Sequence, residues 1–418
     1  MLITDLVTHV ISSPWYLIEA KEGKNVHLEH LEDLVFNNGF AGAQQALEYV
    51  NGVRDMLSQG GDKTKVTVKW DGAPAIVCGV DPEDGKFFVG TKSVFAKSPK
   101  LVKSKKDLNE WYGGSPLHSI LGQALTLFPK LGIGGVLQGD LLFGGDRMPT
   151  PTEIDGEQYI IFRPNTITYA VKEGTELADR IKQAKLGIVF HTTYVGESVA
   201  EMTAQFGASI SGLNQISDVW VEDAYYKDYT GIATFSEQEN AIIEKAVAQV
   251  NSTLTKMDAN AFDTFLRQAD FAKWIKPFMN AKVRQGQSVG DPIAFLKEFT
   301  EYFKDKMKKE IGGLKGGVDS PAAQKRLARI AEKEKFIADN SNTLLGILAV
   351  YKQLISLKLM LISKLNKVEG IGTFLKTDTG YKVTNPEGFV AIGHKGDAVK
   401  LNDRLEFNRA NFTLAKEW

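Results

Sequence analysis

The spacing of apolar residues changes twice along the 418-residue chain. Residues 24–59 carry apolar side chains at helical spacing, with a break at Asn37-Asn38-Gly39. From Lys65 the apolar positions alternate as they do in strands. After Ser236 long helical patterns follow, and strand character returns at Gly380–Phe407. The pattern predicts an α+β fold in which strands from both ends of the chain belong together.

The individual elements follow from the same spacing. Strands are predicted around residues 66–68, 76–77 and 87–89, separated by Asp-Gly turn signals, and at Val136–Leu142, Tyr159–Phe162, Ile167–Val171 and Gly187–Tyr194. Helices are predicted at His27–Val35, Ala41–Leu57, Ala241–Lys256, Ala261–Trp274, Ile293–Lys309, Ala322–Ala338 and Thr343–Lys367. The predicted domains are an N-terminal helical segment at 1–60, a β-rich domain at 61–235, a helical insertion at 236–367 and strands at 368–418 that close the β-rich domain.

Composition narrows the class of protein. One cysteine excludes an internal disulfide framework and favours a reducing compartment, so a cytoplasmic location is expected. The first twenty residues lack a basic leader, so no secretory signal is predicted. The most apolar stretch, Leu344–Leu365, contains three lysines, which favours a buried core helix over a membrane span. The net charge of −1 means that any binding to nucleic acid must come from local basic patches.

The strongest chemical signal is Lys69, which lies at the end of a predicted strand, just before the turn signal Asp71-Gly72. A lysine attacks as a nucleophile only when its amine is uncharged, which needs a partly desolvated site or nearby positive charge. A strand end holds the side chain rigidly, and glycine allows close approach to a phosphate. Taken alone, Lys-x-Asp-Gly is also typical of an ordinary hairpin turn.

Three further segments support the nucleophile. Gly139-Asp140-Leu141 presents an acid at a glycine turn in an apolar strand; on its own, an ordinary strand-end aspartate is the better interpretation. Glu387-Gly388-Phe389-Val390 and Val399-Lys400-Leu401 form two strands joined by a tight turn. An acid and a lysine brought together in this way could hold Mg²⁺ and a triphosphate.

The order of these segments resembles motifs I, III, IV and V of the covalent nucleotidyltransferase superfamily, which contains ATP-dependent DNA ligases, RNA ligases and mRNA capping enzymes. The resemblance implies that Lys69 forms a lysyl-AMP phosphoramidate and that Asp140 contacts the ribose. It implies that Glu387 binds the metal and that Lys400 contacts the α-phosphate. It also implies an antiparallel, ATP-grasp-like ligase domain, here with a large all-α insertion.

Other residues complete the predicted nucleotide site. Asp71 and Gly72 are expected to bind the nucleotide with Lys69. Lys92 is similar to the basic residue that the family offers between motifs I and III, and it opens a run of six lysines up to Lys106 that is either a phosphate track or a solvated loop. Phe162, or else Phe190, matches the aromatic residue that stacks on adenine, although core packing is the usual role of such a residue.

The chain departs from the family at two positions. The family has glutamate where Asp140 stands, and a second motif V lysine where Asn402 stands. The roughly dozen residues after Arg404 leave no room for the C-terminal oligonucleotide-binding (OB) barrel of DNA ligases and capping enzymes. This favours the phage type of RNA ligase, whose accessory domains are often helical.

The sequence therefore predicts an ATP-dependent RNA ligase that uses Mg²⁺ or Mn²⁺ and acts on RNA ends, in the host cytoplasm if a phage encodes it. No membrane partner is expected, and the sequence does not indicate an oligomeric state. A DNA ligase of reduced architecture is one alternative. An inactive nucleotidyltransferase fold that binds nucleic acid is the other, and Asp140 and Asn402 favour it.

Overall fold

The computed structural model describes residues 28–59, 64–226, 234–268, 271–312, 319–367, 371–377, 380–384 and 386–405. They form a mixed α+β protein whose sheets are largely antiparallel, so the predicted fold class is confirmed at this level. The chain divides into two compact units. The six-strand unit contains Pro74–Asp146 and Ala184–Asp223, and the helix-rich unit contains Leu28–Ala73, Arg147–Gln183 and the described residues from Ala224 onward.

The six-strand unit is one sheet with strand order β10-β9-β5-β3-β4, and β11 pairs in parallel with β9. Its elements are β3 (Ala75–Val80), β4 (Phe87–Gly90), η2 (Lys92–Phe95), α3 (Lys105–Tyr112), α4 (Leu117–Leu127), η3 (Phe128–Leu131), β5 (Val136–Gly144), β9 (Leu186–Val195), β10 (Thr203–Phe206) and β11 (Val219–Asp223). Cys78 packs with Leu121 of α4, whereas its neighbour Val77 packs with Phe88 and Tyr194. Because successive strand residues point to opposite faces, this sheet has a hydrophobic cluster on each face.

The helix-rich unit contains a four-stranded sheet with the order β1-β15-β14-β2. Its strands are β1 (Glu29–His30), β2 (Lys65–Lys69), β14 (Gly388–Ile392) and β15 (Ala398–Leu401). β14 is antiparallel to both β2 and β15, so strands from opposite ends of the sequence pair directly, as the sequence predicts. One face of this sheet carries Val66, Phe389, Ala391, Val399 and Leu401, which belong to one core with helices α2 and α11.

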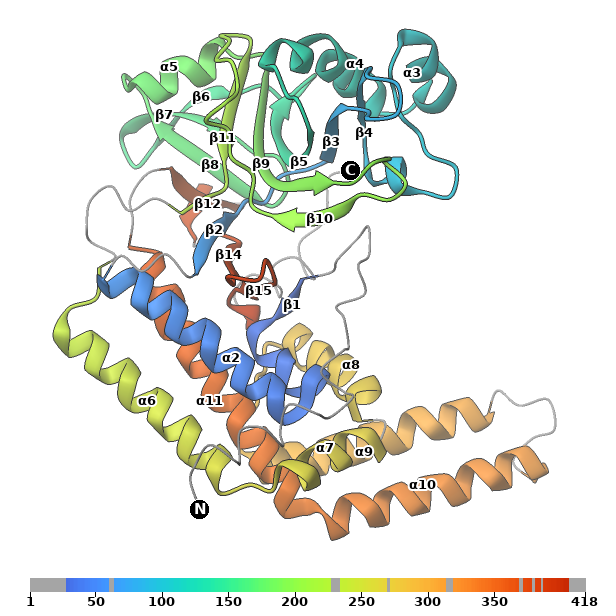
Figure 1. Ribbon diagram of the computed structural model, residues 1–418. Helices are drawn as coiled ribbons and strands as arrows, with labels where there is room; N and C mark the ends of the chain where they lie inside the picture. Colours follow the sequence, from blue (N-terminus) through green and yellow to red (C-terminus); the bar gives the residue numbers. More distant parts are fainter. Residues whose placement is uncertain are drawn as a thin grey trace, which may run out of the picture. The chain divides into compact units, whose positions relative to one another are not determined.

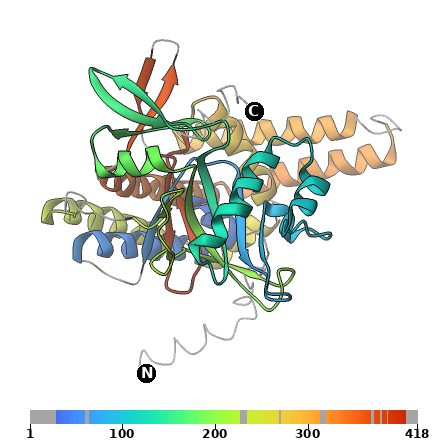
Figure 2. The ribbon, with the colours of Figure 1, turned by 90° about the horizontal axis from the view of Figure 1, so that it is seen from above.

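Helices form the larger part of the same unit. They are η1 (Leu31–Asp33), α2 (Leu34–Gln59), α6 (Glu237–Thr255), α7 (Ala259–Gln268), α8 (Phe271–Arg284), α9 (Pro292–Gly312), α10 (Pro321–Asp339) and α11 (Ser341–Leu365). Figures 1 and 2 show α9 and α10 as two long helices side by side. One continuous core joins residues of α2, α6, α7, α9 and α11 to the strands. The helices of the predicted insertion and the four-stranded sheet thus share their packing.

A second sheet of the helix-rich unit has the strand order β13-β12-β8-β7-β6. Its elements are β6 (Thr150–Ile154), β7 (Glu157–Phe162), β8 (Ile167–Lys172), the neighbouring helix α5 (Glu176–Gln183), β12 (Gly372–Thr377) and β13 (Gly380–Val383). Phe374 of β12 pairs with Thr168 of β8. Residues about two hundred positions apart therefore lie on adjacent strands.

The beginning of the described chain differs from the sequence prediction. Glu29 and His30 form a short strand that pairs in parallel with β15, and Leu31–Asp33 is a 3₁₀ helix, so the predicted helix His27–Val35 is wrong there; His27 lies outside the described residues. The predicted break at Gly39 is present inside α2, where its φ is 62°. A Cβ at this position would lie 2.1 Å from Asp263 Oδ1, so the kink requires glycine.

Helix α11 is long and apolar enough to cross a membrane by length and composition alone, and it is the one such helix among the described residues. In this structure it packs against α2 and α6, and Leu344, Leu348 and Leu354 on it are 0% exposed. Lys358, one of the three lysines that interrupt its sequence, is also buried and is ion-paired. These contacts are those of a core helix.

Candidate functional site

Lys69 is the last residue of β2, and it forms an ion pair with Glu387. The backbone pairing of Lys69 with Gly388 places these two side chains next to each other, although they are more than three hundred residues apart in the sequence. The Lys69 side chain is 29% exposed and that of Glu387 is 13% exposed. The amine is therefore partly desolvated and still open to a ligand.

Lys400 lies on the same face of this sheet as Lys69. Val390 pairs with both Lys400 and Thr67, so these three side chains lie on one face of the sheet. Lys69 follows Thr67 by two positions, and strand alternation places its side chain on the same face. Burial lowers the pKa of Lys400, and the positive charge of Lys69 lowers it further. Two amines thus lie on the sheet face opposite the helical core, and Glu387 is the ion-pair partner of one of them, Lys69.

Asp71 holds the chain that follows Lys69. Its carboxylate accepts hydrogen bonds from Asn165 Nδ2 at 2.7 Å and from the backbone N–H groups of Thr166 and Ile167 at 2.7 and 2.8 Å. Its own N–H donates to Tyr169 Oη at 2.7 Å. Asp71 is 4% exposed; burial raises its pKa, although these hydrogen bonds oppose the shift.

Asp71 is therefore a positioning residue, and this geometry does not support its predicted contact with the nucleotide, because its carboxylate is occupied by the protein. Gly72, which follows it, is half-buried in irregular backbone. The contact of Asp71 with a nucleotide stays a prediction, whereas the hairpin-turn interpretation is wrong. β2 pairs with β14, whereas β3 pairs with β4 and β5 in the other unit.

Gly388 is the residue between Glu387 and the rest of β14. Its φ is 144°, and a Cβ there would lie 2.5 Å from Asn402 Cβ and 2.7 Å from the Leu401 carbonyl oxygen. Only glycine allows β14 and the end of β15 to approach so closely. Asn402, which stands where the family has a lysine, is 3% exposed beside this glycine.

A buried charged cluster adjoins Lys400, and sequence reasoning missed it. His30 pairs with Lys400 across β1 and β15. Next to it, Lys358 Nζ donates to both carboxylate oxygens of Glu32 at 2.7 Å, and Arg404 Nη1 donates to Asp33 Oδ1 at 3.1 Å. We define Glu32, Asp33, Lys358 and Arg404 as the buried charge cluster.

The ionisation of this region follows from burial. Burial lowers the pKa of His30 well below its usual value, and the cations Arg404, Lys358 and Lys400 add to this shift. A neutral imidazole therefore lies next to Lys400 at neutral pH. His30, Glu32 and Asp33 lie in the segment where the sequence predicts the helix His27–Val35, so the pattern gave no signal for this arrangement.

Two predicted site residues, Asp140 and Lys92, belong to the six-strand unit. Asp140 pairs with Ala75, and its Oδ1 lies 3.5 Å from His191 Nε2. Lys92 is exposed at the start of η2. The predicted site is thus divided: Lys69, Glu387 and Lys400 come together in the helix-rich unit, and Asp140 and Lys92 lie in the six-strand unit.

The predicted aromatic residues are buried. Phe162 is 3% exposed and its ring stacks on Tyr169 with centroids 5.4 Å apart. Phe190 is 0% exposed and packs on Phe128. Neither ring presents an open face to a base, which agrees with the core interpretation that the sequence left open. Trp70, half-buried and 4.9 Å from Tyr169 between ring centroids, lies directly after Lys69 and was not singled out.

Among the described residues, no group of three or more His, Cys, Asp or Glu side chains could hold a metal ion. Magnesium, however, is commonly bound through one or two carboxylates together with waters and substrate phosphates. Glu387 supplies one such carboxylate. The residues fit a metal that arrives with a nucleotide better than a metal that the protein holds by itself.

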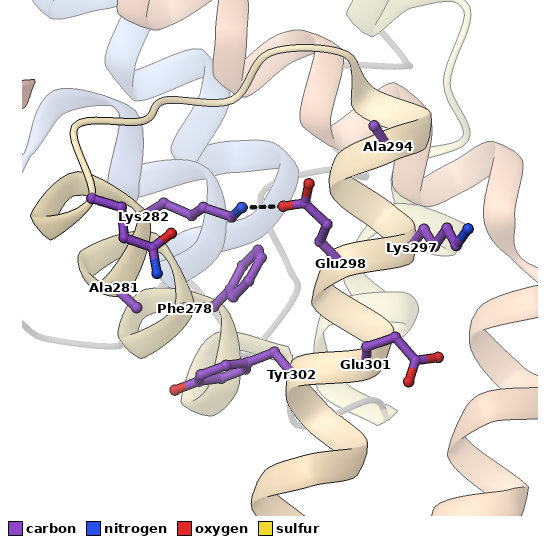
Figure 3. Close-up of a pocket in the computed structure, with 9 residues that line it drawn as sticks. Phe278, Ala281, Lys282, Ala294, Lys297, Glu298, Glu301 and Tyr302 are labelled. Carbon is purple, nitrogen blue, oxygen red and sulfur yellow. Dashed lines mark ion pairs between the residues drawn. The ribbon is translucent and has the colours of Figure 1, made fainter.

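A cavity of about 520 Å³ lies between α8 and α9, away from every predicted site residue (Figure 3). Phe278 and Tyr302 line it, and Lys282 and Glu298 form an ion pair across it. Phe299 and Phe303 of α9 are buried in hydrophobic clusters, whereas Tyr302 is only half-buried. Helix α9 is therefore amphipathic, with these two phenylalanines on its buried side.

These observations define a class: an α+β protein in which an antiparallel sheet joins a strand-end lysine to a glutamate and a second lysine from the far end of the chain. The chain belongs to DUF6267, a family of unknown function, whose model matches residues 25–416. Comparisons with the curated proteins and with the solved structures find no match.

Proposed function

We propose that this protein is an ATP-dependent polynucleotide ligase, acting on RNA, that works through a lysyl-AMP intermediate at Lys69. The observation that supports the proposal is the ion pair of Lys69 with Glu387, together with the position of Lys400 on the same sheet face as Lys69. These are the residues that the motif resemblance assigns to the nucleophile, the metal and the α-phosphate. Because they are far apart in the sequence, a fold that kept them apart would have contradicted the resemblance.

The chemistry has three steps. Neutral Lys69 Nζ attacks the α-phosphorus of ATP, a P–N bond forms, the bond to the β-phosphate oxygen breaks, and pyrophosphate leaves while the amine gives up a proton to solvent. The AMP then passes to a 5′-phosphate end and Lys69 is released. A 3′-hydroxyl finally attacks the activated phosphate, expels AMP and forms the phosphodiester bond.

The surrounding residues have separate tasks in these steps. Lys400 provides positive charge for the α-phosphate as negative charge develops there. Asp71 and its partners Asn165 and Tyr169 fix the chain next to Lys69. Glu387 would hold Mg²⁺ or Mn²⁺, which would neutralise part of the triphosphate charge.

The choice of RNA rests on the resemblance of the Glu387–Val390 strand and of Lys400-Leu401-Asn402 to phage RNA ligases. A nucleic-acid-binding protein that has lost catalysis is the alternative that Asp140 and Asn402 favour. The two functions differ in whether a covalent adduct forms.

Incubation with ATP labelled at the α-phosphate, with Mg²⁺, tests the proposal. We expect label on the wild-type protein and none on Lys69→Ala or Lys69→Arg, because neither variant has a primary amine at that position. The side chain is partly exposed at a strand end, so both variants should unfold at temperatures close to that of the wild type. Arginine keeps the positive charge beside Glu387 and controls for loss of the ion pair.

The joining step is tested with 5′-phosphorylated RNA and DNA substrates of the same sequence. We expect sealed RNA and little sealed DNA. Absence of label on the wild-type protein, or label that persists in Lys69→Ala, would overturn the proposed function. If the wild-type protein is labelled but seals only DNA, it is a DNA ligase and the assignment to RNA is overturned.

A further inference from the structure

The segment Thr91–Lys106 of the six-strand unit, which we call the lysine loop, carries six lysines. Lys103 is neutralised, because its Nζ lies 2.6 Å from Asp81 Oδ2 and 2.9 Å from Asp84 Oδ2. The other five are exposed, and none has an ion-pair partner within the described part of the chain; they are Lys92, Lys97, Lys100, Lys105 and Lys106.

This excess of charge is confined to the loop. Outside it, the lysines of the six-strand unit are Lys86, Lys130 and Lys185, and each lies within 3.9 Å of an aspartate carboxylate, Asp84 or Asp218. The unit contains no arginine within its described ranges. Each lysine of the unit outside the loop therefore lies near a carboxylate, whereas, among the described residues, five of the six loop lysines do not.

The backbone of the loop is firmly anchored. Val94 and Val102 are 0% exposed, and Val89 and Val102 exchange two backbone hydrogen bonds of 3.0 Å. Ser93 Oγ lies 2.9 Å from Tyr112 Oη of helix α3. Because the backbone is already ordered, binding a ligand costs little more than the ordering of the lysine side chains.

We propose that the lysine loop binds the sugar-phosphate backbone of a polynucleotide. The phosphates of a polynucleotide carry negative charges at regular spacing, which are complementary to several lysines without ion-pair partners. Lysine contacts phosphate as a point charge and does not distinguish the bases. No large hydrophobic side chain of the loop is exposed, so it lacks the apolar residues with which a peripheral protein enters a lipid surface. The identity of the partner rests on the proposed function, whereas the binding itself does not need catalysis.

The test measures the affinity for single-stranded RNA by fluorescence anisotropy between about 50 and 200 mM salt, the range over which phosphate contacts weaken strongly. The loop variant combines Lys97→Ser, Lys100→Ser and Lys106→Ser, and leaves Lys92 unchanged because it is a predicted nucleotide contact. The matched control combines Lys245→Ser, Lys256→Ser and Lys308→Ser, which removes the same charge from exposed positions on α6 and α9 and between α6 and α7.

We expect the loop variant to bind more weakly and to lose about 2 from the slope of log affinity against log salt, since each lysine–phosphate contact contributes about 0.7 for a single strand. The control should keep the wild-type slope. Equal loss in both variants would overturn the proposal. Displacement of the RNA by polyglutamate at equal charge, or loop-dependent binding to vesicles containing phosphatidylserine, would also overturn it and assign the loop to those partners.

Two further measurements separate this proposal from the proposed function. Lys69→Ala should bind RNA as the wild type does, because the loop is intact. The loop variant should still form the labelled adduct with ATP. A protein that binds RNA through the loop but forms no adduct would contradict the ligase proposal alone.

Discussion

Lys69 has two charged neighbours that act on its amine in opposite directions. Glu387 forms an ion pair with it, whereas Lys400 brings a second positive charge near it; burial and this like charge lower the pKa of Lys400. A ligand that draws Glu387 out of the ion pair would leave the two amines near each other without that carboxylate. The reactivity proposed for Lys69 therefore depends on what Glu387 binds.

Asp71→Asn should separate positioning from nucleotide binding. An asparagine has one acceptor oxygen where the carboxylate has two, and the other position becomes an NH2 donor. Either Asn165 Nδ2 or the backbone N–H groups of Thr166 and Ile167 then lose their acceptor, at a cost of about 1–3 kcal/mol. We expect adduct formation to slow about tenfold, the rate equivalent of about 1.4 kcal/mol, while half-saturation with ATP stays unchanged.

Asp140→Asn is the matched comparison, since the resemblance implies that Asp140 contacts the ribose. This variant should raise the ATP concentration needed for half-saturation. If Asp71→Asn weakens ATP binding as much as Asp140→Asn does, Asp71 is a nucleotide ligand and its positioning role is refuted.

The site residues could be predicted where a local motif carries the chemistry. Lys69, Glu387 and Lys400 stand in short segments whose order pointed to a shared site. The role of Asp71 could not be predicted, because its partners Asn165 and Tyr169 lie more than ninety positions away. Phe162 fails for a different reason: an aromatic residue in an apolar strand has the same pattern whether it packs in a core or stacks on a ligand.

At the scale of elements, alternation and helical periodicity located β2, β5, β7, β8 and β9 and the long helices α6 and α9–α11. β1 was missed because two residues are too short to show any period, and it exists through its pairing with β15. Helices α3 and α5 are polar and short, so their apolar positions are too few to signal a helix. Strand β12, which precedes the predicted return of strand character at Gly380, is defined by its pairing with β8, which is distant in sequence.

The buried charge cluster joins η1, α11 and the end of β15, and its two carboxylates should respond differently to substitution. Burial opposes ionisation of Glu32, but Lys358, His30 and Arg404 lower its pKa to about 2. Glu32→Gln leaves Lys358 buried without its counter-ion, which costs about 3–5 kcal/mol. We expect urea unfolding at pH 7 to show a loss of that size.

Asp33→Asn should be milder and should change the pH dependence. Burial raises the pKa of Asp33 to about 6, against the attraction of Arg404. A carboxyl whose pKa is higher in the folded state favours folding as pH falls, here between about 6 and the ordinary value of 3.8. The wild type should therefore gain about 1.4 kcal/mol from this group between pH 7 and pH 5.

Asp33→Asn has no group to titrate there and should lack that gain in urea unfolding compared at the two pH values. Glu32 titrates in the opposite sense, because its lowered pKa stabilises the fold above about 4.5 and this stabilisation disappears toward pH 2. Glu32→Gln should keep a difference of the same sign between pH 7 and pH 5 but a smaller one, because the negative charge of Glu32 contributes to the raised pKa of Asp33. The same pH dependence in Asp33→Asn and the wild type would contradict the ionisation described for this cluster.

At the scale of the whole molecule, the sequence indicated a helical insertion at 236–367 within a β-rich domain. The two compact units divide the chain differently, because the core of the four-stranded sheet continues into α6, α7, α9 and α11. Periodicity shows that a helix has a buried face but not which element covers it. The partners of that face became visible only in three dimensions.

Two deletions of different length in the helical region test this shared core. Replacement of residues 237–366 by a flexible linker removes Leu344, Leu348, Leu354 and Leu361, all 0% exposed, from the core that supports β14 and β15. Each buried leucine contributes about 1.5–3 kcal/mol, so the loss exceeds what a domain of ordinary stability can tolerate. We expect no cooperative unfolding transition and no labelled adduct.

Removal of residues 305–328 alone, with a short Gly-Ser link, is the matched control. It takes away the distal parts of α9 and α10, whose Met307, Ile311 and Ala323 form a small separate cluster, and it leaves Phe295 and Phe299 in the main core. This variant should unfold cooperatively and still form the adduct at Lys69. If the larger deletion also folds and is labelled, the helices are an independent insertion, and the sheet that carries Lys69, Glu387 and Lys400 needs no helical core beyond α2.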